Sequence, residues 1–430
     1  MQYIKIIEVI NLQQLANTYV LKPIVVSMKL NWRRKLLPVT VMNTLLLSNF
    51  LVPMAQADSD DTFNLNVGTS YQHDSNLFRL PDGVQPTGDG AERSDNISKT
   101  NLGFKIDKEY SLQTFKLDYL HQIVRFDNAD FLNYNANNYN ATWMWALTPS
   151  LKGNLSSART VDLVPFIDFN SSDTLNLRTA KTQIFDFDFS PHNVWHLLGG
   201  YTNLDSTNSQ TFLPETSYKF DALEGGVKYS FPSDSYVALK FRNRNGSQDA
   251  NNFSLISTGF TEKEEELSAY WNVTGKSKLG ANVGHNKRDD DSFAIRDFSG
   301  YFGGIDYVWN ATAKVNLNIN LSRKLAAFQD TTSSYTVNDV LSIRPTWAPT
   351  SKTLVRASLQ IGKRKFLGDG PVLSATDRED DTLSYGIGAD WTPRSTIKLS
   401  INLQHEQRNS NVAIKDYSAN IASINGQLTF

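Results

Sequence analysis

After residue 57 the chain alternates apolar and polar side chains, one residue at a time, in repeated segments about the length of a long strand. The alternation is clearest at residues 185–189, 315–322, 384–391 and 397–404. Because successive side chains of a β-strand point to opposite faces, each apolar set lies on one face of a strand. Helical periodicity is nearly absent from this part of the chain. The pattern therefore predicts an all-β fold whose strands have one apolar and one polar face.

Short turns and longer polar connections follow one another along the chain, which is typical of strand pairs. The turns are expected near residues 108–112, 148–151, 190–193, 231–235, 274–277, 310–313, 348–352 and 392–396. The longer connections are rich in Asp, Asn, Ser and Gly and include residues 74–96, 162–174, 202–219, 245–263, 288–298 and 367–381. Short turns at one end and long loops at the other are typical of bacterial outer-membrane barrels. A propeller would need four strands in each repeat, and the pattern supports only two.

The hairpins, together with a first strand at 63–73 and a last strand at 417–430, predict a transmembrane antiparallel up-and-down β-barrel of about 18 strands. An even strand number places both termini on the periplasmic side, with short periplasmic turns and longer extracellular loops. A barrel of this size is too wide for side chains to fill, so a water channel is expected.

Aromatic residues gather near the expected turns. Every tryptophan after residue 57 lies close to one of them, and these residues are expected to form an aromatic girdle: Trp143, Trp145, Trp195, Trp271, Trp309, Trp347 and Trp391. Burial in a soluble β-sandwich core would not place them in this way. A second girdle near the loops is expected from Phe126, Tyr134, Tyr139, Tyr218, Phe220, Phe298, Tyr301 and Tyr417.

The two ends of the chain carry further signals. Residues 28–35 are basic, residues 36–52 are apolar and 55–57 read Ala-Gln-Ala, which together predict a secretory signal peptide cleaved after Ala57. We expect Met28 to be the natural start and residues 58–430 to form the barrel; a transmembrane anchor is the alternative for the apolar run. The last strand ends on Phe430 and resembles the assembly signal that Gram-negative barrels present to the barrel-assembly machinery.

Composition narrows the choice of function. The 430 residues include 42 Lys+Arg, 44 Asp+Glu and no Cys. A nearly neutral chain argues against a nucleic-acid partner, and the lack of Cys excludes disulfide scaffolds, thiol catalysis and the commoner structural zinc sites. A mean hydropathy of −0.37 excludes a membrane protein built of several apolar helices. The average is low because each strand combines an apolar face with a polar one.

If the apolar faces contact lipid, the polar faces line a lumen, which is the candidate functional site. The basic side chains expected there form a track for an anionic substrate: Lys116, Lys228, Lys240, Arg242, Arg244, Arg288, Lys314, Lys324, Arg344, Arg356, Arg364, Lys398 and Arg408. The acidic ones are fewer: Asp118, Asp186, Asp188, Asp306, Asp390 and Glu406. A cationic pore lining favours anions. The alternative is that mixed charges only support solubility and strand pairing.

Signals for catalysis and metal binding are weak. The chain has no G-x-S-x-G, H-E-x-x-H or P-loop pattern, and its six His are scattered, with His285 and His405 expected on the outer face. The acidic stretches 289–291 and 377–381 lack the spacing and the Gly of an EF-hand loop and are expected to be solvated. We expect no enzyme activity, no cofactor and no metal site.

Residues 71–80 read Tyr-Gln-His-Asp-Ser-Asn-Leu-Phe-Arg-Leu. This stretch resembles the Y-x-x-D-x-N-L-F-R motif near the mature N-terminus of EpsL-type proteins, the β-barrel porin family of exopolysaccharide operons. Asp74, Asn76 and Arg79 match the motif, and a role in a turn is expected for them. The resemblance implies a bacterial outer-membrane protein that takes part in exopolysaccharide biosynthesis and export.

The expected function is therefore a passive polar conduit for an anionic polysaccharide. The polysaccharide chain, outer-membrane lipid and lipopolysaccharide, and a periplasmic export partner are its expected partners. A general diffusion porin and a plugged structural or surface-binding barrel are the alternatives.

Overall fold

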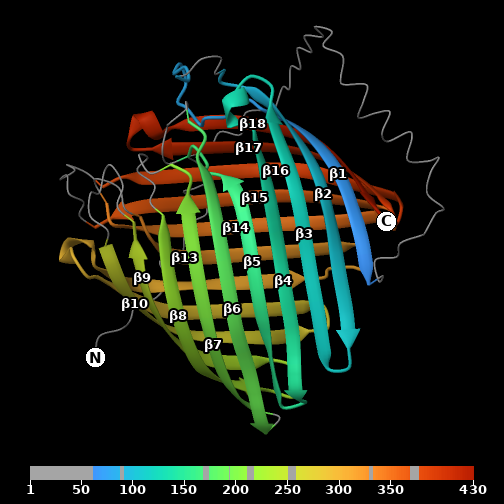
Figure 1. Cartoon of the computed structure of the whole chain (residues 1–430), viewed down its shortest axis with the longest axis vertical. Coiled ribbons are helices and arrows are strands. Elements are labelled where there is room, and N and C mark those ends of the chain that lie inside the picture. The colour runs from blue at the N-terminus through green and yellow to red at the C-terminus, as the bar shows by residue number, and fades with distance from the viewer. Residues whose placement is uncertain are drawn as a thin grey trace. The chain divides into compact units, whose positions relative to one another are not determined.

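The computed structural model describes residues 62–87, 92–167, 174–192, 194–210, 217–249, 258–328, 333–368 and 377–430. These residues form 18 strands and three single-turn 3₁₀ helices, shown in Figure 1. The strands are β1 Phe63–Asp74, β2 Asp95–Tyr110, β3 Gln113–Phe126, β4 Tyr134–Thr148, β5 Leu151–Leu163, β6 Leu177–His192, β7 Trp195–Asn208, β8 Tyr218–Ser230, β9 Tyr236–Gln248, β10 Thr258–Thr274, β11 Ser277–Asp290, β12 Phe298–Trp309, β13 Val315–Ala327, β14 Tyr335–Thr350, β15 Thr353–Leu367, β16 Glu379–Arg394, β17 Ile397–Ser410 and β18 Tyr417–Thr429. The helices are η1 Asp130–Leu132, η2 Ala294–Arg296 and η3 Ala413–Lys415.

The strands close into one antiparallel barrel. Each strand pairs with the next along the chain, and β18 pairs with β1. Just before this last pairing, Leu65 and Phe430 exchange two backbone hydrogen bonds of 2.8 Å. In Figure 1 the blue and green strands make the near wall, and the orange and red strands cross behind them. The predicted 18-stranded up-and-down barrel is confirmed.

The eight tight turns lie where the sequence analysis places them, whereas some strands run further into the polar connections than expected. For example, β7 ends at Asn208 and β8 begins at Tyr218, although residues 202–219 were expected to form one loop. Backbone hydrogen bonds between neighbouring strands form regardless of side-chain polarity, so strand pairing continues past the apolar segment.

Apolar side chains cover the outer face of the barrel. Within the described strands, the exposed large apolar side chains fall on one face around the whole ring, with Met144 as the exception. All seven predicted girdle tryptophans lie on this face near the turns. Six of them are exposed, whereas Trp145 is only 9% exposed because its ring stacks on Phe185.

The second girdle differs from the expectation. Tyr139 and Tyr301 lie on the outer face, but the other six aromatics point inward: Phe126, Tyr134, Tyr218, Phe220, Phe298 and Tyr417. The outer tyrosines nearer the loops are Tyr71, Tyr119, Tyr139, Tyr201, Tyr301 and Tyr385. His285 and His405 lie on the same outer face, beside Tyr301 and Tyr385, with ring centroids 5.1 and 5.0 Å apart.

Among the described residues, no helix has the length and apolarity needed to cross a membrane. The predicted signal peptide, its cleavage after Ala57 and the start at Met28 lie outside the described residues and stay predictions.

Candidate functional site: the inner face of the barrel

Residues directly opposite each other in neighbouring strands share a face, so the strand register assigns each side chain to the lumen or to the outside. By this criterion twelve of the thirteen predicted basic residues line the lumen: Lys116, Lys228, Lys240, Arg242, Arg244, Arg288, Lys324, Arg344, Arg356, Arg364, Lys398 and Arg408. Lys314 instead precedes β13 in a turn, where its Nζ donates to the carbonyl oxygen of Pro349 at 3.0 Å. The six predicted acidic residues also line the lumen.

The lumen is not basic overall, in contrast to the expectation. The register adds further carboxylates to the inner face: Asp74, Asp95, Asp107, Glu109, Asp162, Glu224, Glu262, Glu264, Glu266, Asp290 and Asp380. It adds fewer cations: Lys99, Lys105, Lys152, Arg178 and Lys278. These acids were not expected in the lumen because many lie at strand ends, outside the apolar runs that indicate the face of a strand.

A network of ion pairs covers the inner face of β8 to β11. We call it the charged ladder: Glu224, Lys240, Arg242, Arg244, Glu262, Glu264 and Arg288. Glu264 joins two arginines, with its Oε1 2.6 Å from Arg242 and its Oε2 2.9 Å from Arg244. Glu224 lies 2.8 Å from the Lys240 Nζ and also pairs with Arg242. The cations predicted to bind an anion are therefore already bound to carboxylates of the barrel itself.

Other lumen cations are paired in the same way. Lys116 pairs with Asp107 at 3.0 Å, and Asp390 binds both Arg356 and Lys398 at 2.7 and 3.5 Å. Arg344 and Lys324 form no ion pair with any residue that the structure describes. Direct pairing leaves little net positive field for a passing anion.

The inward aromatics near the loops stack on arginines. The Arg288 guanidinium lies 3.5 Å from the Phe260 ring centre, and that of Arg408 lies 4.9 Å from Tyr417. Arg364 lies between two rings, 5.0 Å from Phe328 and 4.7 Å from Phe366. Of the six aromatics that were expected at the lipid interface but point inward, Tyr417 and Phe220 make such contacts, with the Arg244 guanidinium 5.9 Å from the Phe220 ring centre.

A serine, a histidine and an aspartate are hydrogen-bonded in the order of a catalytic triad near the turns. The Ser230 Oγ lies 3.1 Å from the His196 Nε2, and the His196 Nδ1 lies 2.5 Å from Asp188. Asp188 also binds Lys228 at 2.6 Å. The backbone N–H of Ser230 donates to Val194, and that of the next residue donates to Ser235, so neither is available to stabilise an oxyanion. These residues therefore form a polar network on the inner face that links neighbouring strands.

The motif segment, residues 75–80, folds into the barrel at the loop end. Phe78 is fully buried, and together with Leu77 and Leu80 it belongs to an apolar cluster with Ile97 and Val124 of the inner wall. Figure 1 shows this part of the chain at the blue loop above β1 and β2. The segment therefore narrows the mouth on the side of the first strands.

Polar contacts fix the motif segment in place. The Asn76 side chain closes a tight turn, donating to the Leu80 carbonyl at 2.8 Å and accepting from the Leu80 N–H at 2.9 Å. Arg79 has a φ of 53° and binds Asp74 at 2.9 Å and Glu406 at 3.3 Å. Burial alone would lower the pKa of Arg79, but the two facing carboxylates raise the pKa above its usual value. The expected turn role thus extends to a bridge across the strands, from β1 to β17.

Neutral polar residues cover the inner face from β16 through β18 and β1 to β2. We call this surface the amide wall: Ser384, Gly386, Gly388, Ser400, Asn402, Gln404, Ser423, Asn425, Gln427, Asn66, Gly68, Ser70, Gln72, Asn101 and Gly103. Gly68 lies on the border of a hollow of about 610 Å³ that Asn66, Asn101, Asn425 and Gln427 also line. β1 and β10 are half a ring apart, so the amide wall faces the charged ladder across the lumen.

The amide wall has hydrogen-bonding groups to spare. The Asn66 Oδ1 accepts from Gln427 at 3.3 Å and from Thr429 at 2.9 Å, and its Nδ2 donates to none of the described residues. The Asn425 side chain makes no hydrogen bond within the described part of the chain. Donors and acceptors in this arrangement suit a ligand rich in hydroxyl groups.

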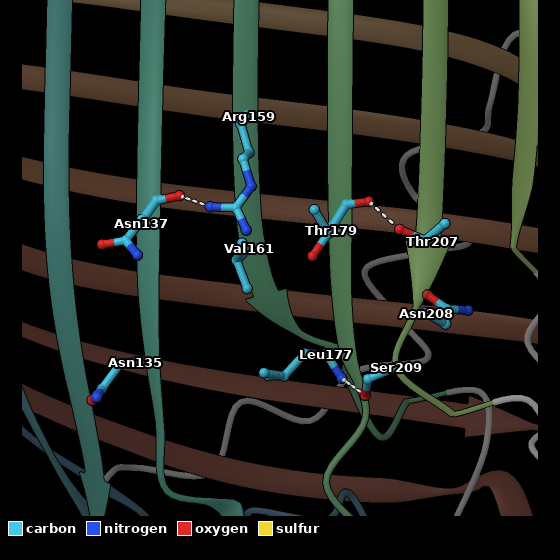
Figure 2. A pocket seen from close by; sticks show the side chains of 9 residues that line it. All are labelled: Asn135, Asn137, Arg159, Val161, Leu177, Thr179, Thr207, Asn208 and Ser209. Carbon is cyan, nitrogen blue, oxygen red and sulfur yellow. Dashed lines mark hydrogen bonds between the residues drawn. The ribbon is translucent and has the colours of Figure 1, made fainter.

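A smaller hollow of about 300 Å³ lies on the wall of β4 to β7 near the loops, shown in Figure 2. Asn135, Asn137, Arg159, Thr179 and Thr207 line it, and the register puts all five side chains on the outer face. The hollow is therefore separate from the lumen.

The C-terminal part of the chain matches a family model. The model of the family described as "Putative beta-barrel porin 2" matches residues 271–430, from the end of β10 to the C-terminus. No curated protein matches the chain.

Three solved structures are similar in the path of the chain. OpdK of Pseudomonas aeruginosa, crystallised with vanillate, is 9% identical, with 86% of this chain and 99% of that chain covered and a TM-score of 0.49. OccK2 (OpdF) of P. aeruginosa in complex with glucuronate is 11% identical, with 86% and 98% covered and a TM-score of 0.47. A BenF-like porin from Pseudomonas fluorescens Pf-5 is 12% identical, with 86% and 99% covered and a TM-score of 0.47.

Proposed function

We propose that this protein is a porin-like pore of the bacterial outer membrane that passes polar solutes. The observation that carries the proposal is the closed ring of 18 strands with an apolar outer face and a polar inner face. A closed barrel leaves no unpaired strand edge in lipid, and its apolar belt contacts the acyl chains of the bilayer core. Trp near the turns and Tyr nearer the loops mark the two interfaces, and the turns face the periplasm in this proposal.

The charge of the lumen supports a pore with weak ion selectivity. The cations of the charged ladder are neutralised by carboxylates at hydrogen-bonding distance, so they present little net charge to an ion in transit. An excess of one sign would be needed for strong selection. The prediction of an anion-selective basic track is therefore replaced by a nearly neutral lumen.

A finer proposal is that the transported solute is an exopolysaccharide on its way out of the cell. The resemblance of residues 71–80 to the EpsL-type motif supports it, and so does the amide wall, whose amides and hydroxyls match the hydroxyl groups of a sugar. Successive weak hydrogen-bonding sites would let a chain slide without being held. This chemistry favours a polymer with little charge, and the driving force comes from polymer synthesis or a periplasmic partner.

Planar-bilayer recording of the purified protein tests the pore. We expect steady single-channel conductance and a permeability ratio for K⁺ over Cl⁻ near one. A sealed barrel would give no current and would favour the structural or surface-binding alternative. Strong anion selectivity would show instead that the lumen is basic in function.

Oligosaccharides added to the open pore test the finer proposal. We expect neutral dextran oligomers to interrupt the current for longer than dextran sulfate of the same length or polyethylene glycol of the same size. Replacing Asn101 and Asn425 by Ala should shorten these interruptions. The matched control replaces Asn316 and Asn318, which lie on the inner face of β13 outside the amide wall. If all three polymers interrupted the current for equal times, the protein would be a general diffusion porin and the finer proposal would be wrong.

A further inference from the structure

Three cations lie on the outer wall of β3 to β6, two of them level with Tyr139 and one on its loop side. Arg125, Arg159 and Lys181 share the outer face with the lipid-facing residues of their strands. Arg159 is directly opposite Tyr139 on one side and Lys181 on the other. The group therefore begins where the apolar belt ends.

No carboxylate in the described part of the chain is bound to these cations. Arg125, Arg159 and Lys181 form no ion pair with any described residue, although Lys181 has Asp205 opposite it on β7. Other cations of the outer face are paired, since Arg323 lies 2.7 Å from Asp339 and Lys363 binds Glu379. Lys219 and Lys263 also lie on the outer face and form no ion pair with a described residue, but neither is part of this group. Two like charges directly opposite each other in a sheet repel, so an anion bound between Arg159 and Lys181 would relieve this pair.

The neighbouring amides offer donors rather than acceptors. The Asn135 Oδ1 accepts from the Arg125 guanidinium at 3.0 Å. The Asn137 Oδ1 is bonded to Tyr119 at 3.0 Å and to the His121 ring at 2.7 Å. With both oxygens engaged, the two Nδ2 groups are left to donate. Arg159 donates one N–H to the Asn137 carbonyl at 2.5 Å, as Figure 2 shows, and its remaining N–H groups border the hollow.

We propose that this outer cationic site, formed by Arg125, Asn135, Asn137, Arg159 and Lys181, binds the phosphate of a lipid headgroup in the surrounding leaflet. Guanidinium and ammonium groups with added amide donors are the groups that bind phosphate oxygens. The exposed side chains of Leu155 and Phe185 lie on the same outer face on the turn side, where acyl chains would run. The lipid site rests on the proposed membrane location of the barrel, but it does not depend on the passage of solutes through the lumen.

Native mass spectrometry of the full chain in detergent tests the site, with bisphosphorylated lipid A, monophosphorylated lipid A and inorganic phosphate as probes. The test variant combines R159Q with K181Q. The matched control combines R323Q with K363Q, which removes the same charge from paired cations on the outer face. Heat-modifiable gel mobility identifies folded protein. If the double variant does not fold, K181Q alone is used as the test variant.

We expect bisphosphorylated lipid A to bind the test variant about tenfold or more weakly than the wild type, because charge-assisted hydrogen bonds are lost. The control variant should bind as the wild type does, and monophosphorylated lipid A should bind the wild type less well. Equal binding by the test variant, or equal weakening in the control, would overturn the proposal. Tight binding of inorganic phosphate without binding of lipid A would refute the lipid assignment.

Discussion

Arg79 shows how a single side chain can set the shape of a pore mouth. It joins Asp74 at the end of β1 to Glu406 on β17 and holds the motif segment between them. The Asp74 side chain is only 3% exposed, so its charge has little water to solvate it. A buried carboxylate without its partner is costly, which makes this bridge a sensitive polar contact of the mouth.

Replacing Arg79 by Ala should therefore free the motif segment. We expect about 3–5 kcal/mol of local destabilisation from the stranded Asp74 carboxylate. The measurements are single-channel conductance and protease cleavage within residues 75–80, and both should increase. K287A is the control, because the Lys287–Asp289 pair is exposed and worth at most about 1 kcal/mol. Unchanged conductance and cleavage in R79A would mean that the apolar cluster holds the segment alone.

Glu264 controls the charge of the ladder. Changing it to Gln leaves Arg242 and Arg244 with one fewer negative partner, so the pore should become measurably more anion-selective. The reversal potential in a KCl gradient reports this change. Glu265 is the adjacent residue and points outward, so E265Q serves as the control and should not alter selectivity. A reversal potential in E264Q equal to that of the wild type would contradict the ladder's role.

At the scale of elements, the strands and turns were predictable because the signals are local. Alternation and turn residues placed all eight tight turns and the 18 strands. What failed was the assignment of aromatics near the loops, such as Phe126 and Phe298, to the outer face. Their direction depends on the register and on partners far away in sequence, and a shift of one residue reverses the face.

Packing between neighbouring strands includes glycines covered by phenylalanine rings. A Cβ on Gly246 of β9 would lie 2.5 Å from the Phe260 ring and 2.5 Å from the Lys219 carbonyl oxygen. G246V should therefore lower the stability of the barrel by about 1–3 kcal/mol. The temperature at which heat-modifiable mobility is lost measures this effect. Gly225 has nothing within 4 Å of its Cβ position, so G225V should leave that temperature unchanged.

At the scale of the whole molecule, closure depends on the two ends of the barrel meeting. Phe430 exchanges hydrogen bonds with Leu65, and its exposed ring lies on the outer face. The sequence predicted its role in assembly from the chain end alone, whereas the pairing with β1 is a contact between residues far apart in sequence. The charge balance of the lumen has the same origin, because ion pairs such as Arg244–Glu262 form only once the strands are in register.

Two variants separate the ring of Phe430 from its backbone. F430A keeps the backbone pair with Leu65 and removes the ring, whereas deletion of the residue removes both. If the ring is the assembly signal, both variants should insert poorly, measured as the heat-modifiable fraction in the outer membrane. If F430A inserted at the wild-type level, the ring would not be the assembly signal, and Phe430 would contribute only through its backbone pairing with Leu65.

The length of the strands has a consequence for the cell surface. They run from 12 to 17 residues, although about 9–11 tilted residues cross a bilayer. The excess lies toward the loops, where outward side chains such as Lys287, Asp289 and Asn409 are polar. A rigid collar of hydrogen-bonded sheet therefore stands above the lipid and lifts the loops away from it. In the proposed orientation, this ordered collar is a surface outside the membrane that phage, antibodies or neighbouring cells can reach.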